Sequence, residues 1–212
     1  MRGSNAIKQP KWLAWAQRLQ AISQTGLAYS KDGYDLERYR QLRAIAVEIV
    51  ADRLDASQEE VTAAFALGSG YPTPKVDVRA VVFQGEQVLL VRERAVGLWS
   101  LPGGWADVGE GPGEVAARET LEEAGYRVRP AKLLAVFDKA KHGHPPSLEY
   151  VYKLFVLCQL EGGTPKTGLE TDAVAFFHKD GLPELDSGRV TVAQILRMFE
   201  HHTNPALPTD FD

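Results

Sequence analysis

The chain has 212 residues, of which 44% are hydrophobic and 25% charged, and these values are ordinary for a globular protein with one core or a core plus a small accessory unit. The net charge of −4 argues against a general binder of nucleic acids or anionic membranes. No apolar stretch reaches the ~18 residues of a membrane span, and the N-terminus lacks the apolar segment of a signal peptide. Cys158 is the single cysteine and lies in an apolar run, so we expect a buried thiol in a cytoplasmic protein.

Residues 1–67 have the pattern of a small helical domain. In "PKWLAWAQRLQAI" apolar residues recur at helical spacing, and Gly26 follows as a stop signal. A second helix is expected in "DLERYRQLRAIAVEIVADRL", and a third begins at a capping box between Ser57 and Glu60 and ends near Gly68. The apolar stripe of the first helix consists of Trp12, Trp15, Leu19 and Ile22. Such a stripe predicts either a self-contained cap or a dimerisation surface.

Residues 68–75, "GSGYPTPK", are rich in glycine and proline and predict a linker. The pattern then changes to strands, and we expect one domain over 76–205. Strand-like segments, with β-branched and aromatic content, occur at 76–84, 87–94, 132–139, 149–160 and 173–179, with a short strand and turn at 99–104. A helix is expected at 190–202. Strands that surround at least two helices predict a mixed α+β or α/β/α layout.

An unusually acidic helix is expected between Pro112, which suits a first turn, and Gly125, which suits a helix end. Glu119, Glu122 and Glu123 have the spacing i, i+3 and i+4, which places three carboxylates on one face. Another face, free to pack on a sheet, carries Ala117, Leu121 and Ala124. Like charges at this spacing destabilise a helix by ~0.2–0.5 kcal/mol, so the acidic face needs an explanation.

Two explanations of the acidic face remain open from the residues alone. One is an ordinary solvated face, which Arg118 relieves through Glu114 and Glu122, each four residues away. The other is a site for a hard divalent cation, Mg²⁺ or Mn²⁺, since these ions bind carboxylate and carbonyl oxygens. The Gly-Gly turn, the loop acid Glu110 and the lack of lysines on this face favour the cation.

The same stretch resembles the signature of the Nudix hydrolases. Gly104, Glu110, Arg118, Glu119, Glu122, Glu123 and Gly125 match the seven fixed positions of that signature at the required spacings. Thr120 departs from the pattern, because the family usually has an aliphatic residue there. The departure affects local packing more than chemistry, since a β-branched residue can still pack.

The resemblance implies an α/β/α sandwich with a mixed sheet, here preceded by the helical N-terminal domain. It implies hydrolysis of the pyrophosphate bond of a nucleoside diphosphate linked to another moiety X, with Mg²⁺ or Mn²⁺ as cofactor. Glu119, Glu122 and Glu123 would bind the metal together with the carbonyl of Gly103. Arg118 would orient these glutamates, and Glu110 would brace the loop.

The general base is less well defined, because the family places it variably. Glu170 precedes a late strand at a spacing where members often have another acid, and it is our first choice as base or extra ligand. Glu149 and Glu119 are rivals. The alternative for Glu170 is a solvated loop acid.

The N-terminal residues resemble the helical extension of a bacterial Nudix subgroup that includes enzymes cleaving CDP-choline and, in some members, ADP-ribose. Strand arginines and loop histidines are candidates for the phosphates, and aromatic side chains are candidates for stacking on a base or a choline head. These substrate-binding candidates are Arg79, Arg92, His142 and His144, with Trp99, Trp105 and Tyr29. Outward strand charges, a mobile loop and ordinary packing are the corresponding alternatives.

A rival function from another class is a nucleotide-sensing Nudix-like regulator without catalysis. That function requires a basic recognition helix and usually a degraded signature, whereas here the signature is intact and the basic residues of "ERYRQLR" alternate with acids. We therefore expect an enzyme acting on a small nucleoside diphosphate derivative, with no nucleic-acid or membrane partner. From the tryptophan stripe and the subgroup resemblance we also expect a homodimer.

Overall fold

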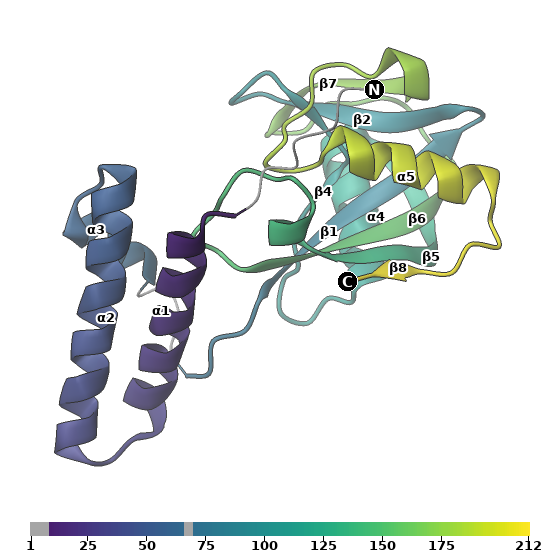
Figure 1. Ribbon diagram of the computed structural model, residues 1–212. Coiled ribbons are helices and arrows are strands. Elements are labelled where there is room, and N and C mark those ends of the chain that lie inside the picture. The colour runs from purple at the N-terminus through teal and green to yellow at the C-terminus, as the bar shows by residue number, and fades with distance from the viewer. Residues whose placement is uncertain (1–8, 66–69) are drawn as a thin grey trace. The chain divides into compact units, whose positions relative to one another are not determined.

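The computed structural model describes residues 9–65 and 70–212 of the chain. These residues form two compact units (Figure 1). The first consists of 9–65 and 70–74 together with the short segment 146–150, and the second of 75–145 and 151–212. The predicted boundaries at 68–75 do not foresee that 146–150 groups with the helices, nor that the second unit continues past residue 205.

The first unit is built from three helices, α1 (Lys11–Tyr29), α2 (Gly33–Leu54) and α3 (Gln58–Phe65). The side chain of Asp32 accepts hydrogen bonds from two backbone amides at the start of α2. The capping box predicted for α3 is present, since the amide of Glu60 donates to Oγ of Ser57 and the amide of Ser57 donates to the Glu60 carboxylate. The expected end of this helix near Gly68 lies outside the described residues.

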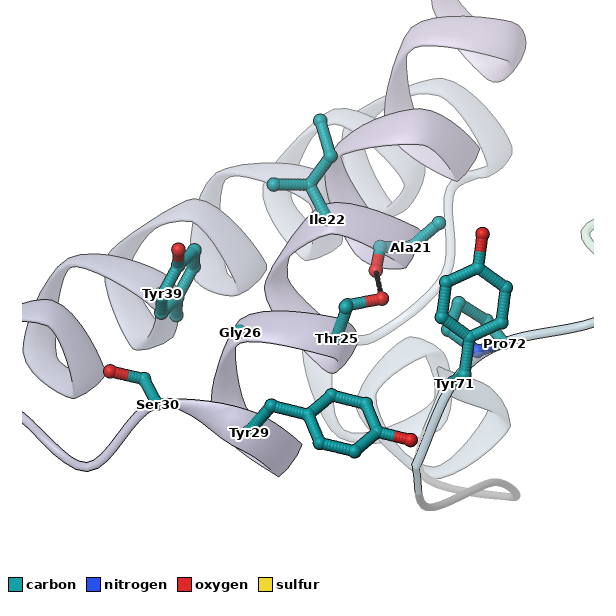
Figure 2. Close-up of a pocket in the computed structure, with 9 residues that line it drawn as sticks. All are labelled: Ala21, Ile22, Thr25, Gly26, Tyr29, Ser30, Tyr39, Tyr71 and Pro72. Carbon is teal, nitrogen blue, oxygen red and sulfur yellow. Dashed lines mark hydrogen bonds between the residues drawn. The ribbon is translucent and has the colours of Figure 1, made fainter.

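Gly26 does not end α1, so this prediction is wrong: the helix continues to Tyr29. The reason is close packing between helices. A Cβ atom on Gly26 would lie 2.4 Å from atoms of the Tyr39 ring of α2, so the glycine gives the ring room instead of marking a stop (Figure 2).

The apolar stripe of α1 is divided between the core and the surface. Trp12 and Leu19 pack against a core that includes Ala16, Val47 and Val50. Trp15 and Ile22 are 57% and 51% exposed. The segment 146–150 joins the same core through Leu148. The side-chain amide of Gln17 donates to the backbone carbonyls of Ser147 and Leu148.

The second unit is organised around one mixed eight-stranded sheet. Its main order is β3-β2-β1-β6-β5-β8, with β4 paired to β1 and β7 paired to β2. β1 runs parallel to β6, β8 runs parallel to β5, and the other pairs are antiparallel. The strands are β1 (Lys75–Gln84), β2 (Gln87–Glu93), β3 (Trp99–Ser100), β4 (Gly103–Trp105), β5 (Tyr126–Asp138), β6 (Val151–Gly163), β7 (Thr171–His178) and β8 (Asp210–Phe211).

A helix covers each face of this sheet, as Figure 1 shows. Alternate residues of β1 point to opposite sides, so that Val78 and Ala80 pack with α4 (Pro112–Ala124) while Val81 packs with α5 (Val192–Thr203). The predicted α/β/α sandwich with a mixed sheet and a helical N-terminal region is therefore confirmed. Within the described residues, no helix is long and apolar enough to span a membrane.

Two parts of the sheet were not anticipated. β5 begins at Tyr126, six residues before the predicted strand, and its pairing with β6 shifts register at three places, one of them beside Pro130, which cannot donate to the ladder. β8 arises where Arg197 and His201 of α5 hold Asp210 beside β5. Such a strand depends on distant partners more than on its own two residues.

Candidate active site

The Gly-Gly turn enters β4 in a conformation that only glycine adopts easily. Gly103 has φ 145°, and a Cβ atom on it would lie 2.0 Å from the carbonyl oxygen of Val78 on β1. Its amide donates to Oε2 of Glu123 over 2.9 Å. The next residue, Gly104, is less constrained: a Cβ atom there would lie 2.8 Å from Oε1 of Glu119, the end of a side chain that can move. The turn and two glutamates of α4 are thus in direct contact.

α4 begins and ends as predicted. The Glu114 carboxylate accepts from the amide of Gly111 just before Pro112, and Gly125 ends the helix in the left-handed conformation. Thr120 is fully buried, and its hydroxyl donates to the Ala116 carbonyl, so this departure from the family pattern is accommodated within the helix. Leu121 was expected on the packed face, but this prediction is wrong.

The packed face of α4 includes Ala117 and Ala124 as predicted, but it extends away from Leu121. Leu121 is 51% exposed, because at 3.6 residues per turn the face through Ala116, Thr120 and Glu123 carries the contacts with the sheet. Glu123 therefore lies on the packed side and is only 6% exposed. The side chain of Glu122, one position earlier, is 59% exposed.

Arg118 connects the loop acid to the acidic face. Its Nε donates to Oε1 of Glu110 over 2.9 Å, and its Nη2 donates to Oε2 of the same carboxylate, also over 2.9 Å. Nη1 donates to Glu119 over 2.9 Å and to Glu122 over 3.2 Å. Because one guanidinium holds three carboxylates, their positions relative to the Gly-Gly turn are defined by a single side chain.

The local electrostatics favour a cation. Burial raises the pKa of Glu123 to about 7, and the neighbouring carboxylates Glu119 and Glu93 add to the shift. Burial also raises the pKa of Glu119, and the charge of Glu122 acts in the same direction. Several carboxylates that are costly to ionise together, beside a turn with backbone carbonyls, form a donor set suited to Mg²⁺ or Mn²⁺.

The arrangement is not a closed ligand shell. Across 9–65 and 70–212, no three acidic, histidine or cysteine side chains are already gathered tightly enough to hold a metal ion. In this arrangement the hydrogen bonds from Arg118 and from the Gly103 amide occupy one oxygen each of Glu119, Glu122 and Glu123. Cation binding at this site would require some of these bonds to be exchanged.

A buried ionic group lies beside the acidic face. Arg79 of β1 is 3% exposed, donates from Nε to Asp77 over 2.7 Å, and is close enough to Glu123 to lower its pKa. Lys153 of β6 is fully buried and also donates to Asp77. Burial lowers the pKa of Lys153 to about 8. The sequence analysis selected Arg79 but missed Asp77 and Lys153, whose signal is a charged residue inside an apolar strand.

Glu93, at the end of β2, was also missed by the sequence analysis. It is 3% exposed, and its charge affects the pKa of Glu123, as Glu170 affects that of Glu93 itself. Glu170 is exposed, and its carbonyl accepts from the amide of Arg94 over 2.8 Å. The signal available in the sequence was that Glu93 ends the apolar strand "QVLLVRE", where a charged residue can be buried.

The remaining candidates in this unit are held by other contacts. Arg92 pairs with Asp172 over 2.7 Å and lies 5.9 Å from the ring centroid of Trp99, which itself packs on Phe177. Trp105 is 47% exposed and lies beneath the ammonium of Lys75.

Both loop histidines are fixed. The ring of His142 stacks on Phe137, and its Nε2 lies 3.0 Å from Oδ1 of Asp212. His144 is buried, with Nδ1 on the Ser187 carbonyl over 2.7 Å and Nε2 without a partner among the described residues. Burial lowers the pKa of His144 to about 4, so the ring is neutral at physiological pH.

Tyr29 belongs to the helical unit, where Figure 2 shows it beside a hollow that Tyr39 and Tyr71 also line. Tyr29 and Tyr71 are both exposed. Glu149, a rival for the general base, lies in the segment 146–150 of that same unit.

A family model described as the NUDIX domain matches residues 73–199. The chain belongs to the Nudix family. It is therefore a Nudix pyrophosphohydrolase, as the signature around α4 predicted. A second model, described as a UDP-X-like, N-terminal oligomerisation domain, matches residues 10–65 of this Nudix chain.

Relatives of this Nudix protein match over nearly the whole chain. A Bacillus subtilis protein, YjhB, named provisionally as an ADP-ribose pyrophosphatase, is 46% identical over 96% of this chain and 98% of its own. A crystal structure of a UDP-X diphosphatase is 33% identical, with TM-score 0.62, covering 97% of this chain and 100% of that one. An ADP-ribose pyrophosphatase structure from Streptococcus suis is 41% identical, with TM-score 0.61, covering 66% of this chain and 100% of that one.

Proposed function

We propose that this Nudix enzyme hydrolyses the pyrophosphate bond of a nucleoside diphosphate linked to X, with Mg²⁺ or Mn²⁺, and that ADP-ribose is its first candidate substrate. The observation that carries the proposal is the cluster of Glu119, Glu122 and Glu123, held by Arg118 against the Gly-Gly turn. The names of YjhB and of the Streptococcus suis enzyme favour ADP-ribose. CDP-choline and a UDP-linked compound are the other candidates.

The three glutamates and the carbonyl of Gly103 would hold the divalent cation. When bound, that cation neutralises phosphate charge and lowers the pKa of a coordinated water. Arg118 orients Glu119 and Glu122, and the Gly103 amide orients Glu123. Burial of Glu123 supports this role, since a buried carboxylate with a raised pKa gains most from a cationic partner.

Glu170 is the proposed general base. Its exposure leaves the carboxylate open to water, and its backbone is held at the start of β7 by the amide of Arg94. It would accept a proton from the attacking water as the water oxygen bonds to phosphorus and the bridging P–O bond breaks. The electrostatic effect of Glu170 on buried Glu93 supports a position near the acidic cluster.

Arg79 is the proposed phosphate-binding residue with the best support, because it combines burial with proximity to Glu123. Arg92 and Trp99 would form a second, more exposed contact through their cation–π pair. His142 and His144 remain candidates on the loop after β5. Tyr29 remains a stacking candidate in the helical unit, and its role is the least supported.

The helical unit is proposed to form a homodimer. The description of its family model supports oligomerisation. So does the exposure of Trp15, Ile22 and Tyr29, which follow one another at seven-residue spacing along α1. Light scattering of the full chain and of Trp15→Glu tests this: a dimer that becomes monomeric supports it, and a wild-type monomer contradicts it. A cytoplasmic location stays a prediction.

A substrate panel with Mn²⁺ tests the proposed activity. It would offer ADP-ribose, CDP-choline, a UDP-sugar, dinucleoside polyphosphates and nucleoside triphosphates, with phosphate measured after phosphatase addition. A preference of at least about tenfold in kcat/KM for ADP-ribose supports the first candidate, since tenfold corresponds to 1.4 kcal/mol. A similar preference for another compound reassigns X, whereas equal slow rates on all would contradict the proposed substrate class. No observation in the structure favours a regulator without catalysis.

A further inference from the structure

Glu93 lies where β2 and β7 meet the end of α4. In the β2–β7 ladder Arg92 pairs with Ala173 and Glu93 with Thr171, so Asp172 is an extra residue and the register shifts there. Bulges of this kind are frequent next to active sites, where they redirect a side chain. The hydroxyl of Thr171 donates to the Glu123 carbonyl over 2.7 Å. The ladder partner of Glu93 is therefore bonded directly to the backbone of a proposed metal ligand.

Only one oxygen of the Glu93 carboxylate is accounted for. Oε2 lies 3.1 Å from Nη2 of Arg189, which also pairs with Asp186. Oε1 is buried and has no hydrogen-bond partner among the described residues, although the residue is only 3% exposed. A buried polar atom left without a partner costs about 1–3 kcal/mol, and more when it is charged.

The surroundings of Glu93 make this cost larger. Glu123, Glu170 and Asp186 repel its charge, and Arg79 and Arg189 attract it. The ion pair with Arg189 explains Oε2, and the charge of Arg79 offsets part of the repulsion from Glu123, but Oε1 still has no hydrogen-bond partner among the described residues. A divalent cation between the two buried carboxylates would offset both, because it bonds oxygen atoms and carries two positive charges.

We propose that Oε1 of Glu93 belongs to the ligand shell of the divalent cation, directly or through one bound water, so that the site is built from β2 as well as α4. Arg189 is then a positioning residue that holds Oε2 and aims Oε1. This inference rests on the proposed metal-dependent function, and it adds a carboxylate that lies outside the Nudix signature.

Mn²⁺ binding by the full chain without substrate tests the inference, with free Mn²⁺ quantified by electron paramagnetic resonance. Glu93→Gln keeps the shape of the side chain and is expected to weaken Mn²⁺ affinity about 10- to 100-fold, while the melting temperature in EDTA stays at or above that of the wild type. The matched control is Glu86→Gln in the exposed turn at the opposite end of β2, which should bind Mn²⁺ as the wild type does.

The outcomes separate the two proposals. A wild type that binds no Mn²⁺ contradicts the proposed function and the inference together. If Glu119→Gln loses Mn²⁺ and Glu93→Gln binds it as the wild type does, the proposed function stands and this inference is overturned. Should Glu93→Gln fail to fold, a wild-type crystal soaked in Mn²⁺ decides: Oε1 must contact the ion or one of its waters, and an ion bound elsewhere overturns the inference.

Discussion

The backbone amide of Gly103 donates to Oε2 of Glu123 over 2.9 Å, joining the first residue of β4 to the last turn of α4. This bond orients a carboxylate that is almost completely buried and whose neighbours include Glu119 and Glu93.

Replacing Glu122 tests the acidic face with the least risk to the fold, because its side chain is 59% exposed. We expect Glu122→Gln to reduce kcat/KM at least about 100-fold, since it removes charge stabilisation at the reacting phosphates. Circular dichroism and the melting temperature should match the wild type. Glu161→Gln, an exposed change on β6, is the control. Full activity of Glu122→Gln would contradict the metal-binding role.

Metal removal should act reversibly. EDTA is expected to abolish hydrolysis, because the glutamates would then repel each other and the phosphates without a cation between them. Added Mn²⁺ or Mg²⁺ should restore the rate, and Ca²⁺ should restore it poorly, since Ca²⁺ prefers more ligands at longer distances. Product release from the preferred substrate measures each state. Undiminished turnover in EDTA would be incompatible with the proposal.

The two glycines of the turn should respond differently to alanine. Gly103→Ala places Cβ 2.0 Å from a backbone oxygen at φ 145°, so we expect a loss of at least about 2 kcal/mol in unfolding free energy. Gly104→Ala places Cβ 2.8 Å from Oε1 of Glu119, which can move. Its stability should change by less than about 1 kcal/mol while Mn²⁺ affinity falls. Urea denaturation would measure the unfolding free energy of both variants, and Mn²⁺ titration would measure their metal affinity. Equal destabilisation by the two changes would contradict this prediction.

The stability of the metal-free protein should depend on pH through the ionisation of Glu123. Burial raises its pKa to about 7 from the ordinary 4.5, so the proton is bound more tightly in the folded state. The contribution of Glu123 to stability is full below about pH 4.5 and is lost as the pH rises through 7.

Glu123→Gln keeps a neutral side chain at every pH. Its advantage over the wild type in unfolding free energy should grow from below about 1 kcal/mol at pH 5 to about 3 kcal/mol at pH 8.5. Urea denaturation in EDTA at both pH values measures this difference. An advantage that does not change with pH would mean that Glu123 ionises normally.

Cys158 should be unreactive in the folded protein. The thiol is buried on β6, and burial raises its pKa to about 12, so almost no thiolate is present at pH 8. Iodoacetamide should leave the native chain unmodified and alkylate it in urea, as mass spectrometry would show. Fast alkylation without denaturant would contradict the buried position.

Much of the fold could be predicted from local patterns. The helix Pro112–Ala124, its capping residues and the strands around it follow from periodicity and from turn residues, which act over a few positions. Gly26 and Leu121 were predicted wrongly for the same reason, because both depend on partners distant in sequence. The Tyr39 ring of α2 packs over Gly26, and the sheet packs against a face of α4 that leaves Leu121 exposed.

The sequence by itself determined the reaction class, because seven residues at fixed spacing along one loop and helix specify the carboxylates and the arginine that holds them. Only the tertiary structure decided which of these carboxylates is buried, and which residues of other strands join them. Sheet pairing sets Lys153 of β6 beside Asp77 of β1 and sets Glu93 of β2 beside Thr171, whose hydroxyl bonds to α4. The physical reason is that burial and charge interactions depend on distance in space, which spacing in the sequence does not supply.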